Sequence, residues 1–165
     1  MANTNNPYGF RLWSRLNGGE GSMPISPAQL KVPSAATLTV GDPIKASLGL
    51  GYIATTTNAI YGIVNSPVPG WNEAATQPHY PDILPADDAT IFRVQSIGAV
   101  NATIGYMGVA KKYRIGGSTT GHLGIDLSHS TGGVLQVIGL APGSAYGTYA
   151  ELLITVTRGA FVGQV

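Results

Sequence analysis

Helix-breaking residues, spread along the whole chain, constrain its fold more than any other feature. The chain contains 23 glycines and 11 prolines among 165 residues, and the segments between them show no amphipathic helical period of useful length. These segments are rich in Val, Ile, Thr and Tyr, which favour strands. Hydrophobic residues make up 44% of the chain, so it can bury a core. We therefore expect an all-β fold, either an antiparallel β-sandwich or jelly roll or a small barrel.

The first part of the chain differs from the rest. Pro24, Pro27 and Pro33 are spaced so closely that no useful helix can form between them. Residues 1–39 are therefore predicted to be an extended N-terminal arm, and residues 40–165 an all-β domain.

Alternating apolar residues predict the strands of this domain. The clearest are residues 134–140 and 150–157, joined by a hairpin-type connection, with further strands at 60–64 and 90–95. In residues 90–95 the period places Phe92 and Val94 on one face, with Arg93 and Gln95 on the other. In the last strand Leu152, Ile154 and Val156 share the core face, opposite Glu151 and Thr155.

The charge content favours an assembling protein. Charged residues make up 10% of the chain, against about 25% in an ordinary soluble domain. A monomer with so few charges is prone to associate, and interface cores are depleted in charge. We therefore expect other subunits to cover much of the surface; a surface that is merely rich in Ser, Thr and Asn is the alternative.

Several classes of function have no support in the composition. The net charge of +1 gives no reason to expect nucleic-acid or membrane binding. No apolar run approaches the roughly 18 residues of a membrane span. The chain has no cysteine, and its polar start does not resemble a secretory leader, so we expect synthesis and assembly in a cytosol.

Candidate catalytic and metal-binding groups are few. His122, Asp126 and His129 lie close in sequence, but on a strand His129 would point away from the other two; polar loop residues are the favoured interpretation. Asp87 and Asp88 are expected to form a turn that begins the next strand. The glycine-rich residues 116–122 lack the Lys-Ser/Thr of a phosphate-binding loop. The basic residues 111–114 are interpreted as a solvated strand edge, with contact to an acidic partner as the alternative. We expect no catalytic residue, no metal, no cofactor and no enzymatic activity.

The aromatic and basic residues of the arm are the candidate contact residues. A segment rich in Gly and Pro cannot build its own core, so it must dock on its own domain, on a sister subunit or on another partner. Tyr, Trp and Arg dominate binding hot spots. The predicted contact residues are Tyr8, Phe10, Arg11, Trp13 and Arg15. The alternative is that Phe10 and Trp13 cap the core of their own domain.

Several segments resemble, in the same order, a family of small head proteins of tailed bacteriophages. The similarity begins with Asn-Pro-Tyr-Gly-Phe-Arg at residues 6–11 and continues with Gly-Asp-Pro-Ile-Lys at 41–45. The later segments are Ile-Tyr-Gly-Ile-Val at 60–64, a Pro-rich connection, Phe-Arg-Val-Gln at 92–95, and then residues 124–128, 135–140 and 147–150.

This resemblance implies a cement or decoration protein that sits on the outer surface of the capsid and staples major capsid protein subunits. It would assemble in the host cytoplasm as a homo-oligomer, with a trimer favoured because capsid lattices offer three-fold positions, and a dimer as the alternative. Another minor head or tail protein is the first competing interpretation. A carbohydrate-binding β-sandwich is the second, although its candidate aromatics, Trp13, Trp71 and Tyr80, are dispersed. A hydrolase with an unrecognised site is the third.

Overall fold

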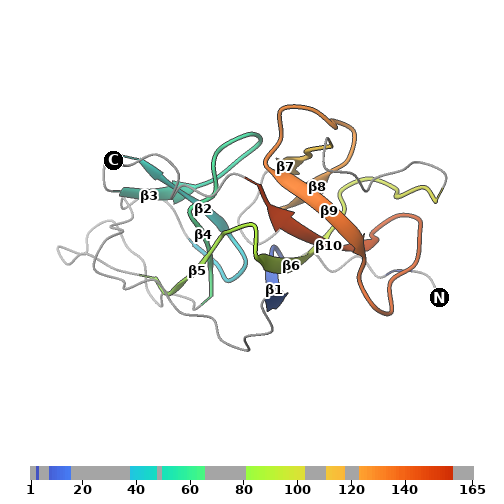
Figure 1. The fold of residues 1–165 in the computed structure, drawn as a ribbon, viewed down its shortest axis with the longest axis horizontal. Coiled ribbons are helices and arrows are strands. Elements are labelled where there is room, and N and C mark those ends of the chain that lie inside the picture. The colour runs from blue at the N-terminus through green and yellow to red at the C-terminus, as the bar shows by residue number, and fades with distance from the viewer. Residues whose placement is uncertain are drawn as a thin grey trace.

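The computed structural model describes residues 3, 8–15, 38–47, 50–65, 81–102, 111–117 and 123–157. None of these residues is helical, and every pairing between named strands is antiparallel. The all-β prediction is therefore confirmed. Figure 1 shows the strands gathered into separate sheets along the molecule.

Sheet A has four strands in the order β1-β6-β10-β9. These are β1 (Arg11–Arg15), β6 (Thr90–Gln95), β10 (Glu151–Val156) and β9 (Leu135–Leu140). The strands predicted at 90–95, 134–140 and 150–157 are thus present. Phe92, Val94, Leu152 and Ile154 are buried in the core, as the alternation predicts, and Arg93 is only partly buried. Gln95 and Thr155, which the alternation predicts on the opposite face, are also buried, at 4% and 6% exposed.

The other two sheets are built from shorter strands. Sheet B has the order β3-β2-β4-β5, and sheet C pairs β7 with β8. Their bounds are β2 (Pro43–Ser47), β3 (Leu50–Ile53), β4 (Gly62–Val64), β5 (Ile83–Pro85), β7 (Arg114–Gly116) and β8 (Gly124–Asp126). Sheet B lies at one end of the view in Figure 1, and sheets A and C lie together at the other.

One core cluster joins all three sheets. It contains Phe92 of sheet A, Ile63 of sheet B and Ile125 of sheet C, each 0% exposed. A smaller cluster, formed by Leu38, Ile44, Tyr61, Val64 and Ile83, lies within sheet B and the turn before it. Isolated bridges from Tyr113 to Leu135 and from Ser96 to Ile125 link sheet C to sheet A. These single bridges are not continuous ladders, and no closed barrel is seen in the described part of the chain. The choice among sandwich, jelly roll and barrel stays a prediction.

Residues 8–15 lie against the rest of the chain. β1 pairs with β6, and Phe10 is 1% exposed within the core cluster. Most other residues of the predicted arm lie outside the described residues. The division into an arm of residues 1–39 and a domain of residues 40–165 stays a prediction.

The backbone at Gly9 and Phe10 meets the backbone at Gly41 in a close joint between sheets A and B. These residues belong to the first two segments of the resemblance. Phe10 N–H donates to the carbonyl oxygen of Gly41 at 2.9 Å, and Gly41 N–H donates to the carbonyl oxygen of Val64 at 2.8 Å. Gly9 and Gly41 have φ of +71° and +93°, and a Cβ on Gly9 would lie 2.5 Å from the Gly41 oxygen. Only glycine fits such an approach in this conformation. The joint therefore holds the start of β1 against the turn that leads into β2.

A buried carboxylate closes this turn. Asp42 is 0% exposed, and its Oδ2 accepts hydrogen bonds from the N–H of Thr39 at 2.8 Å and from its hydroxyl at 3.2 Å. Side chains of Asp commonly stabilise turns in this way. Gly41 and Asp42 thus belong to a structural turn that leads into β2.

Candidate functional site: the outer face of sheet A

The face of sheet A that points away from the core carries a connected group of aromatic and charged side chains. We call this group the outer-face network; its members are Tyr8, Arg11, Trp13, Arg93 and Glu151. The strand period brings them together, because Arg93 and Glu151 alternate with the core residues of β6 and β10. Arg11 of β1 lies opposite Arg93, and Leu153 of β10 lies on the other side of Arg93. Glu151 is therefore a diagonal neighbour of Arg93, within reach of a long side chain.

The carboxylate of Glu151 is the centre of the network. The hydroxyl of Tyr8 donates to Oε1 at 2.5 Å, and Nε–H of Arg93 donates to Oε2 at 2.6 Å. A second N–H of the Arg93 guanidinium, on Nη2, donates to the same Oε2. The side chains of Arg93 and Glu151 are 28% and 18% exposed. Both oxygens of Glu151 are thus occupied in a partly buried ion pair, where charge-assisted hydrogen bonds are stronger than neutral ones.

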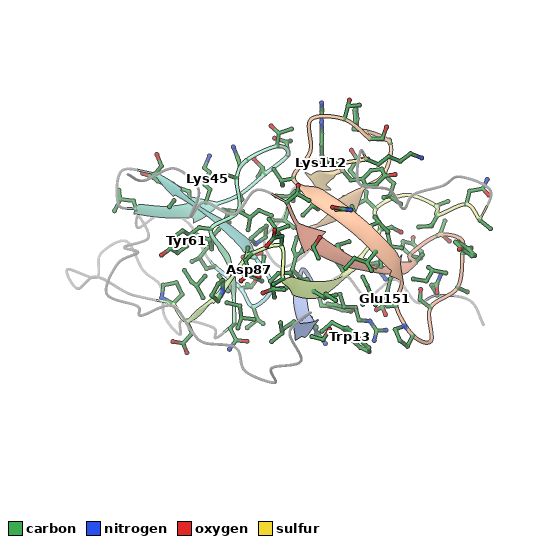
Figure 2. The ribbon with its side chains drawn as sticks, in the orientation of Figure 1. Trp13, Lys45, Tyr61, Asp87, Lys112 and Glu151 are labelled. Carbon is green, nitrogen blue, oxygen red and sulfur yellow. The ribbon has the colours of Figure 1, made fainter. Side chains whose placement is uncertain are left out.

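Two cation–π contacts extend the network toward solvent. The guanidinium carbon of Arg93 lies 5.6 Å from the centroid of the Trp13 ring, and that of Arg11 lies 3.9 Å from the centroid of the Tyr8 ring. Trp13 sits at a β-bulge, where the register with β6 shifts between Leu12 and Ser14. Its side chain remains 43% exposed. Figure 2 shows Trp13 and Glu151 toward the same side of sheet A.

The network is continuous with the connection between β9 and β10. The amide of Asn3 donates to the carbonyl oxygens of Ala145 at 2.8 Å and Thr148 at 3.0 Å. Its own carbonyl oxygen accepts from the N–H of Ala145 at 3.0 Å. The same connection carries Tyr146 and Tyr149, which are exposed, and it enters β10 at Glu151. Asn3 therefore helps to fix the loop beside the network.

The structure brings together three of the five predicted contact residues. Tyr8, Arg11 and Trp13 share the outer face. Phe10 does not, because it is buried in the core and is not available to a partner in this structure; for this residue the alternative of a core position holds. Arg15 is the last residue of β1, and its side chain lies outside the described part of the structure.

Sequence reasoning missed Arg93 and Glu151 as members of the site. It placed both on the face opposite the core, which is where they are found. The available signal was their rarity, since charged residues make up only 10% of the chain. The period does not tell which strands are neighbours, so the contact of Arg93 with Glu151 and Tyr8 could not be predicted.

The other sequence candidates are local turns. Asp126 Oδ1 accepts hydrogen bonds from the N–H of Ser128 at 2.9 Å and from its hydroxyl at 2.5 Å, and its Oδ2 lies 3.0 Å from Nδ1 of His129. Burial raises the pKa of the Asp126 carboxyl, but these hydrogen bonds and the nearby imidazole outweigh it, so the pKa falls below its ordinary value. His122, the third predicted ligand, lies outside the described residues. Within those residues no group of three or more His, Cys, Asp or Glu side chains could hold a metal ion.

Among the remaining candidates, the aspartates before β6 have a structural explanation. Asp87 Oδ1 accepts a hydrogen bond from the hydroxyl of Thr90 at 2.5 Å, so the residues before β6 form the predicted turn. In the basic segment Tyr113 is 1% exposed, and Lys111 and Lys112 are only partly buried. Of the glycine-rich segment, residues 118–122 lie outside the described residues.

The comparisons with known proteins do not assign the chain to a family. The described residues contain no helix long and apolar enough to cross a membrane. No protein-family model matches the chain, and neither a curated protein nor a solved structure matches it.

Proposed function

We propose that this chain is a non-enzymatic structural protein of a bacteriophage virion. It binds the outer surface of the head as a cement or decoration protein and staples neighbouring major capsid protein subunits. One support is the joint between the segments that resemble this family. Gly9 of the first segment touches Gly41 of the second, and Phe10 and Phe92 belong to the same core cluster. The similar segments thus form one structural unit.

The observation that carries the proposal is the outer-face network. It presents an exposed indole and an exposed guanidinium, the side-chain types that dominate binding hot spots, on a paired sheet. Hydrogen bonds and ring contacts hold these groups in place before any partner arrives. Less side-chain entropy is then lost on binding. Many copies, each with several contacts, would turn weak contacts into a stable shell.

The charge content supports association of the protein with itself. We propose a trimer at a three-fold position of the capsid, with a dimer as the alternative. Sedimentation at micromolar concentration is expected to show the oligomer. A monomer that remains monomeric on the shell contradicts this part of the proposal.

The test is reconstitution on heads that lack the protein. Purified wild-type protein is expected to bind them to a fixed copy number, and electron cryo-microscopy is expected to place it on the outside. Trp13→Ala should weaken binding by about thirtyfold, from a hot-spot cost of about 2 kcal/mol. Ile97→Ala is the control, because Ile97 is 48% exposed and its N–H bonds to Ile125 of sheet C, away from the network.

Two results would contradict the proposal. The first is wild-type protein that does not bind heads. The second is density on the tail or at a single head vertex, which would instead favour another minor virion protein.

A further inference from the structure

The charges of the outer-face network do not balance. It contains two guanidinium groups, Arg11 and Arg93, and one carboxylate, Glu151. Arg93 and Tyr8 occupy both oxygens of Glu151. For Arg11 the structure shows a ring contact with Tyr8 but no hydrogen bond or ion pair in the described part of the chain. One positive charge of the network is therefore left without a carboxylate partner among the described residues.

This charge is held in a defined position. The Arg11 guanidinium lies over the Tyr8 ring at 3.9 Å, and the hydroxyl of the same tyrosine is bonded to Glu151. Arg93 holds Glu151 from the other side and lies over Trp13. The face of the guanidinium is thus covered by the ring, while its N–H donors lie in its plane and point outward from its edge. Such a planar edge matches the two oxygens of a carboxylate.

We propose that Arg11 binds a carboxylate of an acidic segment of the partner protein, with Trp13 packing beside that segment. This inference rests on the proposed function and adds the chemistry of the partner: the capsid surface under β1 carries Asp or Glu in an exposed segment. Charge complementarity favours an acidic segment as the partner of Arg11, because the only carboxylate of the network is already bound. Arg11 then makes with the partner the contact that Arg93 makes with Glu151.

The first experiment measures carboxylate binding without the capsid. The full-length protein is titrated with an acetylated and amidated tetra-aspartate peptide while the Arg11 Nε–H signal is followed by NMR. We expect a saturable shift that added sodium chloride weakens. A tetra-asparagine peptide should produce none. Lys112→Gln is the matched control, because Lys112 is a partly exposed cation far from the network in Figure 2.

The second experiment repeats the measurement on heads that lack the protein. Arg11→Gln should bind about tenfold more weakly than wild type, and Lys112→Gln should bind as wild type does. Circular dichroism shows whether each variant is folded. Arg11→Lys keeps the charge but loses the planar edge, so it should be intermediate.

The outcomes separate the two proposals. If wild-type protein binds heads and Arg11→Gln binds equally well, the inference is wrong and the proposed function stands. If wild-type protein does not bind heads, the proposed function fails, and the peptide titration still decides whether Arg11 is a carboxylate site. An equal shift with the asparagine peptide, or a shift that persists at other network residues in Arg11→Gln, overturns that site.

Discussion

Glu151 shows how one residue can connect three segments that are distant in the chain. Its carboxylate accepts hydrogen bonds from Tyr8, 143 positions away, and from Arg93, 58 positions away. A partly buried carboxylate needs such partners, because an unpaired charge out of water is costly. The network is therefore a means of stability as well as a candidate surface.

Tyr8→Phe tests this dual role. Removing the hydroxyl should lower the free energy of unfolding by about 1 kcal/mol. A double-mutant cycle with Glu151→Gln should give a coupling above about 0.5 kcal/mol, because the two groups share a bond. Chemical denaturation measures both quantities. Tyr146→Phe, at an exposed tyrosine, should change stability by less than about 0.5 kcal/mol. Additive effects in the cycle would show that the Tyr8–Glu151 bond does not contribute.

The turn after β8 should make the stability of the fold depend on pH through a single residue, Asp126. The pKa of Asp126 is lowered, despite the burial that raises it, by the hydrogen bonds from Ser128 and the contact with His129. A carboxyl with a lower pKa in the folded state stabilises the fold above its unfolded pKa. This contribution is lost as the pH falls through the folded pKa, below 3.8. Ser128→Ala should raise the pKa of Asp126 in a carboxyl ¹³C titration by NMR, whereas Ser47→Ala should leave it unchanged. An unchanged value in Ser128→Ala contradicts the prediction.

Among the elements, β1 depends most on its neighbours. It lies at the edge of sheet A and pairs only with β6 within the described sheet. Phe10 anchors its start in the core, and the Gly9–Gly41 joint ties it to sheet B. These contacts hold the five-residue edge strand in place, so the positions of Arg11 and Trp13 do not depend on the intrinsic strand propensity of its residues.

Gly9→Ala and Gly132→Ala form a matched pair that tests the joint. The two glycines have φ of +71° and +70°, but only Gly9 has backbone within contact of an added Cβ. Gly132→Ala should cost about 1–2 kcal/mol for the left-handed conformation alone. Gly9→Ala should cost at least about 1 kcal/mol more, because the Gly41 carbonyl must move. Equal midpoints in urea unfolding would show that the close approach does not limit stability.

At the scale of the whole molecule, three sheets share one core, so removing the first strand affects all of them. Deletion of residues 1–16 is expected to lower the unfolding temperature or prevent folding, because it removes Phe10 and leaves the edge of β6 unpaired. Phe10→Ala alone should cost about 3–5 kcal/mol. Trp13→Ala should cost about 1 kcal/mol or less, since it loses mainly an exposed cation–π contact. Calorimetry compares the three. A truncated protein as stable as the full chain would mean that β1 is a detachable arm.

The faces of the strands were determined by the sequence itself. The two-residue period of 90–95 and 150–157 placed Phe92 and Ile154 inward and Arg93 and Glu151 outward, and the structure agrees for these residues. The burial of Gln95 and Thr155 did not follow from it. The turn at Asp87 and Asp88 before β6 and the lack of helix in the described residues followed equally from local chemistry. Such features depend on residues that are neighbours along the chain and on the regular geometry of a strand or a turn. They can therefore be inferred from the sequence directly.

Only the tertiary structure decided which elements meet. It placed β6 between β1 and β10, Phe10 in the core and Tyr8 on Glu151. Strand order depends on which apolar faces are buried together over long separations in sequence, and on the entropy of closing the loops between them. The two-residue period is the same for every possible neighbour, so it cannot select among them. For this reason the composition could only suggest aromatic and basic contact residues, whereas the tertiary structure decided that Tyr8, Arg11 and Trp13 lie on the outer face of sheet A and that Phe10 lies in the core.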